Sequence, residues 1–169
     1  VRSAETNLGD LCADAYRNQS GADVAIVNGG GVRVNIAAGN ITLNDILKVH
    51  PFGNAMCVIE VTGQQILDAL EFGAKDVPGE FGGFLQVSGI TYKIDTAWPA
   101  SVQADDKGVW IGATTGGYRV YDVMVYNKET GVYEPLDLEA KYNLAGYNYT
   151  LRDLGDGFNM FSGAVNVQD

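Results

Sequence analysis

The sequence predicts an α+β fold, in which a mostly antiparallel or mixed sheet has helices packed on it. Residues 84–149 read as successive strands joined by turns, without regular intervening helices. Before them, helical and strand periodicities alternate. The 169 residues, 46% of them hydrophobic, can bury a real core. Residues 1–169 are therefore expected to form a single domain.

The chain opens with a predicted helix followed by a strand. Apolar residues recur at helical spacing from residue 7 to about residue 19, and Thr6 or Asn7 can cap this helix. Residues 24–27 form a short apolar run that stops at Asn28 and three glycines, which is typical of a strand that ends in a turn.

Two further helices flank the next strand. A short helix is expected over residues 42–50, since the following Pro51 disfavours helix in the residue before it. A strand is expected at residues 55–61. Thr62 and Gln65 then form a capping box that marks the start of another helix.

The second half is expected to be mainly β. A turn at residues 127–131 joins two of its strands as a hairpin. Residues 96–117 have weak patterning and are expected to form an excursion loop. The strands are predicted at residues 84–95, 118–126, 132–136 and 142–149.

The charge balance restricts the classes of partner. Lys and Arg total 11 against 21 for Asp and Glu, a formal net charge of −10, so the overall field repels nucleic-acid backbones. Non-specific nucleic-acid binding is excluded on this ground, and an anionic ligand must be held by a few local cations. No apolar run approaches the roughly 20 residues of a membrane span, so no membrane insertion by this chain is expected.

Residues suited to catalysis are scarce. The chain has a single histidine, His50, and no spacing of His or Cys that is typical of a metal site. We therefore assign no catalytic residue and no metal ligand. Cys12 and Cys57 read as buried thiols, although a disulfide is possible. The chain starts without Met and reads as a piece excised from something longer.

Three weak motifs suit a small anionic ligand with a planar group. Three glycines after a strand can bring backbone N–H groups close to a ligand, and Arg33 can offer a planar fork to phosphate or carboxylate. Phe52, between Pro and Gly, can stack on a base, and Asn54 can bond a base edge or sugar hydroxyl. Tyr149 and Asp156 can supply a second aromatic face and an acceptor.

Each motif also has a purely structural explanation. Glycines after a strand usually serve only the turn, a phenylalanine at a turn is often a core residue, and Asp-Gly is a plain turn signal. Their combination is more specific. Five segments occur in the order and approximate spacing of the C-terminal domain of the 5'-nucleotidase family, which the chain resembles over nearly its whole length: NLGDL at 7–11, NGGGVR at 28–33, PFGN at 51–54, FLQVSG at 84–89 and GDGF at 155–158.

The resemblance implies a division of labour between two domains. This chain would be the substrate-binding domain, which clamps a nucleotide or nucleoside. An N-terminal metallophosphoesterase domain in cis, absent from this chain, would carry two divalent metal ions of the Zn, Mn, Mg or Co type and hydrolyse the phosphate ester. The chain alone is expected to be inactive. The family also implies an extracellular, periplasmic or cell-surface location.

Seven substrate-binding residues are implied by position. They are two arginines for the anionic group, two aromatic residues for the base, and three polar residues for base and ribose: Arg2, Arg33, Phe52, Tyr149, Asn28, Asn54 and Asp156. Thr150 stands where the family often has a phenylalanine, so the preceding Tyr149 is assigned as the second aromatic residue.

The same resemblance leaves other functions open. The chain could serve a 2',3'-cyclic nucleotide phosphodiesterase, a nucleotide-sugar hydrolase or a thiosulfate-type hydrolase, because a shared fold does not fix the substrate. A non-catalytic surface module that binds ligands is a further alternative.

Overall fold

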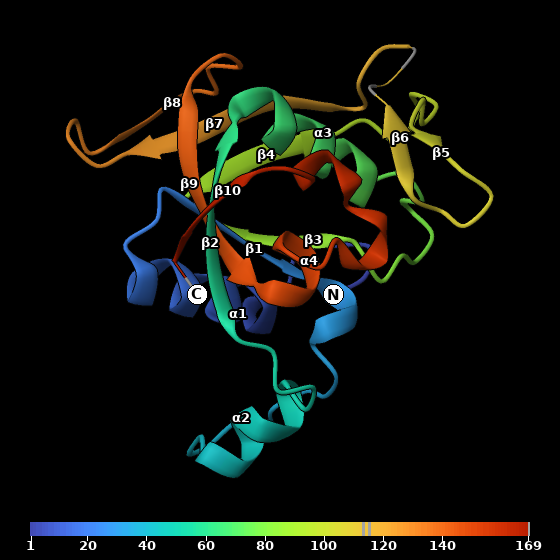
Figure 1. The fold of residues 1–169 in the computed structure, drawn as a ribbon. Coiled ribbons are helices and arrows are strands. Elements are labelled where there is room, and N and C mark those ends of the chain that lie inside the picture. The colour runs from blue at the N-terminus through green and yellow to red at the C-terminus, as the bar shows by residue number, and fades with distance from the viewer. Residues whose placement is uncertain (113, 115, 169) are drawn as a thin grey trace.

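The computed structural model describes residues 1–112, 114 and 116–168, and it has the predicted α+β architecture (Figure 1). A five-stranded sheet with the order β10-β2-β9-β1-β3 forms the centre of the fold. A three-stranded sheet, β4-β7-β8, and a small β5-β6 pair complete the β structure. β1 and β9 are parallel, and the other strand pairs of these sheets are antiparallel, so the main sheet is mixed.

The elements have the following bounds. The helices are α1 (Asn7–Ser20), α2 (Leu43–Val49), α3 (Gly63–Gly73) and α4 (Asn148–Leu151), with 3-10 turns η1 (Gly29–Gly31), η2 (Gly155–Gly157) and η3 (Asn159–Phe161). The strands are β1 (Val24–Asn28), β2 (Met56–Thr62), β3 (Leu85–Ser88), β4 (Ile90–Ile94), β5 (Gln103–Ala104), β6 (Trp110–Gly112), β7 (Val120–Asn127), β8 (Val132–Pro135), β9 (Lys141–Tyr147) and β10 (Val165–Gln168).

The predicted helix starts are confirmed. Thr6 caps α1 by accepting a hydrogen bond from the N–H of Gly9. Thr62 and Gln65 make both bonds of the capping box at the start of α3. α2 also begins with a capping box, at Thr42, and ends at the residue before His50.

β1 is buried on both faces and separates two parts of the core. Val24 and Ile26 belong to the larger apolar cluster, which includes residues of α3 and the C-terminal turns. Val27 belongs to the cluster beneath α1, on the opposite face. Because side chains alternate along a strand, Asn28 follows Val24 and Ile26 onto the face where the C-terminal turns lie.

The predicted strand over residues 84–95 is wrong as a single element. It is two strands, β3 in the five-stranded sheet and β4 in the three-stranded sheet. Between them Gly89 has φ 77°, a left-handed conformation that non-glycine residues rarely adopt, and the chain turns from one sheet into the other there.

The second half of the chain needs three more corrections. The strand predicted at residues 142–149 ends at Tyr147, and the next residues form α4, so Tyr149 lies on a helical turn. The excursion at residues 96–117 contains the short strands β5 and β6, and its residues 113 and 115 lie outside the described part. β10 was not predicted, because its alternating Val-Asn-Val-Gln run is only four residues long, and its side chains are all exposed.

α2 lies at the end of an arm that projects from the rest of the fold (Figure 1). The arm leaves the body after η1 and returns as β2. Its return segment carries Phe52, whose side chain is 61% exposed.

Replacing Phe158 by alanine should lower the free energy of unfolding by about 3–5 kcal/mol, because the site cannot collapse around so large a lost ring. The ring is fully buried and makes an edge contact with Phe72, with 5.2 Å between centroids. Urea denaturation measures the change. The matched control is Val132→Ala, at a position 54% exposed, for which a change within about 0.5 kcal/mol is expected. Equal losses in both variants would contradict this account of the core.

Candidate functional site

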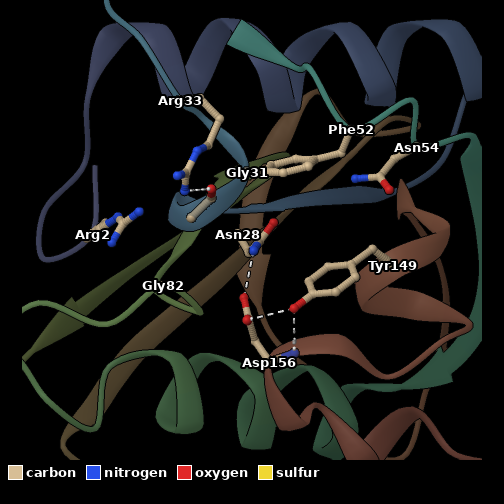
Figure 2. A pocket seen from close by; sticks show the side chains of 10 residues that line it. Arg2, Asn28, Gly31, Arg33, Phe52, Asn54, Gly82, Tyr149 and Asp156 are labelled. Carbon is tan, nitrogen blue, oxygen red and sulfur yellow. Dashed lines mark hydrogen bonds between the residues drawn. The ribbon is translucent and has the colours of Figure 1, made fainter.

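A cavity of about 350 Å³ opens where the triple-glycine turn, the arm and the C-terminal turns meet (Figure 2). All seven residues implied by the resemblance line it, together with three glycines: Arg2, Asn28, Gly30, Gly31, Arg33, Phe52, Asn54, Gly82, Tyr149 and Asp156. The structure thus brings the seven positions together, and their roles in binding remain a prediction.

Each wall of the cavity comes from a different part of the chain. Asn28 ends β1, and Arg33 follows η1. Phe52 and Asn54 lie in the segment that returns from α2. Tyr149 comes from α4 and Asp156 from η2. Because the main sheet pairs β1 with β9, it carries the elements that follow these two strands to the same region of the fold.

Two of the three glycine N–H groups are already bonded within the fold, contrary to the prediction. The N–H groups of Gly29 and Gly30 donate to the carbonyl oxygens of Phe84 and Gly82, both at 2.7 Å, so these two amides are not free for a ligand. The glycines instead permit close packing. A Cβ atom on Gly31 would lie 2.1 Å from the hydroxyl of Tyr147, which is well inside contact distance.

Arg33 joins the turn to the aromatic residue on the arm. Its Nη1 donates to the carbonyl oxygen of Gly30 at 3.0 Å, and its Cζ lies 5.5 Å from the centroid of the Phe52 ring. This distance permits a cation–π contact. The exposed guanidinium keeps further N–H groups that can donate to an anion.

Asp156 is held at the opposite side of the cavity by two side chains. Its Oδ2 accepts from Nδ2 of Asn28 at 2.6 Å, and its Oδ1 accepts from the hydroxyl of Tyr149 at 2.9 Å (Figure 2). The backbone N–H of Asp156 also donates to the Tyr149 hydroxyl, at 3.2 Å. Each carboxylate oxygen can accept a further bond, so the anchored group can still receive hydroxyl donors from a ligand.

Tyr149, rather than Thr150, faces the cavity. Thr150 is 1% exposed and lies inside the fold, whereas Tyr149 is 39% exposed and its ring points toward the cavity (Figure 2). The pKa of Tyr149 is raised, mainly by burial and to a smaller extent by the hydrogen bond to Asp156 and the negative charge of that residue. The hydroxyl therefore stays protonated and donates at neutral pH.

Gly82 is the lining position to which sequence reasoning gave no role. It precedes β3, and the backbone of its loop forms the wall next to Gly30. The paired glycines at 82 and 83 signal a close backbone approach, but only the fold shows which segment they approach.

His50 takes part in packing. Its Nε2 lies 3.1 Å from Sγ of Cys12, and its ring makes an edge contact with Tyr147. Burial lowers the pKa of His50, while a hydrogen bond with the backbone of Gly31 acts in the opposite direction. His50 and Cys12 border a groove of about 460 Å³ between α1 and α2, whose lining residues include none with a charge. This groove offers no charged partner to an anion.

Two negative findings apply to residues 1–112, 114 and 116–168. Within them, no group of three or more His, Cys, Asp and Glu side chains is arranged to hold a metal ion. No helix in the same part of the chain has the length and apolar character needed to cross a membrane. Cys12 and Cys57 are both buried thiols, in separate clusters.

Comparison with protein families decides the assignment. A family model described as "5'-nucleotidase, C-terminal domain" matches residues 1–163. The chain belongs to this family. The predicted resemblance and fold class are thereby confirmed, and the cavity described above lies within a 5'-nucleotidase C-terminal domain.

Relatives of this domain are found within longer proteins. The trifunctional nucleotide phosphoesterase protein YfkN of Bacillus subtilis is 35% identical over 173 residues, covering 100% of this chain and 11% of its own length. A 5'-nucleotidase of Vibrio parahaemolyticus is 36% identical, covering 87% of this chain and 26% of its own. The crystal structure of the 5'-nucleotidase precursor from Thermus thermophilus has a TM-score of 0.80 at 36% identity. The match covers 99% of this chain and 30% of that one. The chain thus spans less than a third of each.

Replacing Asp156 by asparagine should lower the pKa of Tyr149 toward its ordinary value, because the negative charge beside the hydroxyl is removed. Absorbance titration of tyrosinate measures the change, with Tyr149→Phe identifying the signal. Asp153→Asn is the matched control, because Asp153 bonds Asn148 and not Tyr149. An unchanged Tyr149 pKa in Asp156→Asn would show that the carboxylate does not hold the ring.

Proposed function

We propose that this domain binds the substrate of a metal-dependent 5'-nucleotidase, holding the base and the anionic end of a nucleotide in the cavity described above. One observation carries the proposal. Two aromatic rings, Phe52 and Tyr149, and two arginines, Arg2 and Arg33, line a single cavity although they lie far apart in the sequence. A planar base with an attached anion requires this combination.

The geometry supports a position for each part of the nucleotide. The base lies between the rings of Phe52 and Tyr149, where each stacking contact contributes about 0.5–1.5 kcal/mol beyond buried area. The carboxylate of Asp156 accepts hydrogen bonds from the ribose hydroxyls. Asn54 bonds the base edge or the sugar.

The arginines hold the phosphate. Arg33 donates to it from beside Phe52, and Arg2 donates from the N-terminal segment. The net charge of −10 gives no general attraction for phosphate, so binding depends on these local cations.

Hydrolysis belongs to another domain of the parent protein in this proposal. We place two divalent metal ions in an N-terminal metallophosphoesterase domain in cis, where they would polarise the phosphate ester and supply hydroxide. The described part of this chain offers no group of metal ligands, and the relatives it matches are several times longer. The Thermus thermophilus relative is described as a precursor, which fits a protein that acts outside the cytoplasm.

Other esters remain alternatives for the parent protein, including 2',3'-cyclic nucleotides, nucleotide sugars and thiosulfate-type substrates. The two aromatic rings favour a substrate that contains a base. Phe52→Ala in the parent protein separates substrates that contain a base from those that lack one, since it should slow hydrolysis of AMP while sparing an ester without an aromatic group.

Binding by the chain itself should separate the two halves of the site. Calorimetry or chemical-shift titration of the chain with AMP should give a Kd on the order of millimolar, since half of the site is present. Phe52→Ala should weaken AMP and adenosine alike, by roughly 5- to 30-fold, because both contain the base. Arg33→Ala should weaken AMP about 5- to 10-fold and leave adenosine unchanged, because only AMP carries the anion.

Two variants outside the cavity serve as controls. Tyr121→Ala removes an exposed ring on β7, and Lys141→Ala removes an exposed cation on β9, so neither should alter binding. If adding the protein shifts the AMP resonances equally for wild type and for Phe52→Ala, the result would count against the stacking assignment.

The chain alone should not hydrolyse AMP in the presence of Mn, Mg, Zn or Co salts, because it lacks the proposed metal site. Phosphate release by the purified chain measures this, with the parent protein as the positive control. Robust turnover that survives the Phe52→Ala and Arg33→Ala substitutions would point to a contaminating phosphatase, whereas turnover that these variants abolish would overturn the division of labour.

A further inference from the structure

The first six residues form an irregular segment beside the cavity that carries Arg2. The backbone N–H of Phe81 donates to the carbonyl oxygen of Arg2 at 3.0 Å. The Arg2 side chain lines the cavity on the side nearest Gly82 (Figure 2). Arginine has a long, flexible side chain, so its usefulness to a ligand depends on how firmly the backbone beneath it is held.

Gln86 fastens this segment to β3. Its Nε2 donates to the carbonyl oxygens of Val1 at 3.2 Å and Ala4 at 2.9 Å. Its Oε1 accepts from the backbone N–H of Thr6 at 2.9 Å and from the Thr6 hydroxyl at 3.2 Å. All four bonds of the side-chain amide therefore go to residues 1–6, on both sides of Arg2.

The Gln86 side chain is 1% exposed and does not line the cavity. A buried amide makes all its hydrogen bonds or costs stability, so its orientation is fixed. Rotation of the amide would set its oxygen against the carbonyls of Val1 and Ala4. These contacts thus fix the position of residues 1–6 against β3.

Two glycines make room for the fastened segment. A Cβ atom on Gly9 would lie 2.0 Å from Oε1 of Gln86, and one on Gly29 would lie 2.1 Å from the carbonyl oxygen of Val1. Three residues thus meet at the base of Arg2, each from a different segment that identifies the family: Gly9 of NLGDL, Gly29 of NGGGVR and Gln86 of FLQVSG. None of these three residues has been assigned to ligand binding.

We infer that Gln86 is a positioning residue, which sets the backbone of residues 1–6 so that Arg2 meets the anionic group of the nucleotide. This inference rests on the proposed function. Gln86 acts only through Arg2, so its loss affects ligands with an anion and spares those without one. A residue that merely stabilises the fold would affect both kinds of ligand equally.

The main variant is Gln86→Met, which keeps the length of the side chain and removes its four hydrogen bonds. Val1, Ala4 and Thr6 are exposed or half-buried, so the released segment can turn its freed polar groups toward water while the core of the domain is kept. Calorimetry with AMP and with adenosine should show about a 5-fold loss of AMP affinity and an unchanged adenosine affinity. Arg2→Ala sets the upper limit, at about 10-fold for AMP.

A double variant tests the coupling between the two residues. Arg2→Ala combined with Gln86→Met should bind AMP as Arg2→Ala does alone, since Gln86 has nothing left to position. Gly9→Ala breaks the same anchor from α1, because its added carbon displaces the Gln86 amide, and it should reproduce the selective loss for AMP.

The matched control is Gln65→Met. Gln65 also uses its amide to hold backbone groups, at Thr62 and Met160, but it lies outside the lining of the cavity. This variant should lower stability without changing the ratio of AMP to adenosine affinity.

The outcomes distinguish the inference from the proposed function. If Arg2→Ala leaves AMP affinity unchanged, the proposed anion site at Arg2 is wrong. If Arg2→Ala loses AMP affinity while Gln86→Met keeps it, or weakens both ligands equally, the inference is overturned and the proposed function stands. Failure of both Gln86→Met and Gly9→Ala to fold would make Gln86 an anchor of the whole domain and would also overturn its narrower role.

Discussion

The cavity depends on the carboxylate of Asp156, which joins the end of β1 to the C-terminal turns. One oxygen accepts from Asn28, 128 residues earlier in the chain, and the other from the nearby Tyr149, so the carboxylate joins two distant parts of the sequence. Asp156 adopts φ 56°, an uncommon conformation for a residue other than glycine, and its contacts hold it there. This junction adds a side-chain link between the wall that carries Tyr149 and the wall that carries Arg33, beyond the pairing of β1 with β9.

The two sides of the cavity are built differently. Tyr149 and Asp156 are held by side-chain hydrogen bonds, and Phe158, two residues after Asp156, is buried in the core. Phe52 instead lies on a projecting arm, and its ring faces the guanidinium of Arg33. Gly30, Gly31 and Gly82 lie between the two sides and allow backbone segments to approach closely. The wall next to the arginines is therefore made of main-chain atoms.

Most of the fold could be predicted because its signals are local. The capping box at Thr62 and the proline after His50 mark helix ends through neighbouring residues alone. The break at Gly89 and the end of β9 before Tyr149 depend on which sheet each strand joins, which periodicity does not reveal. The site residues were selected by resemblance, since each motif alone also fits a turn. The anchoring role of Gln86 could not be predicted, because its partners lie about 80 residues away in sequence.

The cavity is closed by residues from both ends of the chain, Arg2 near the start and Asp156 near the end. Bringing such distant residues together closes long loops, which costs conformational entropy. A partly folded domain in which residues 1–6 or the turn at residues 155–157 are not yet in place would therefore have no complete binding site. A ligand of this cavity consequently favours only the fully folded state, and its binding energy adds to the stability of that state alone.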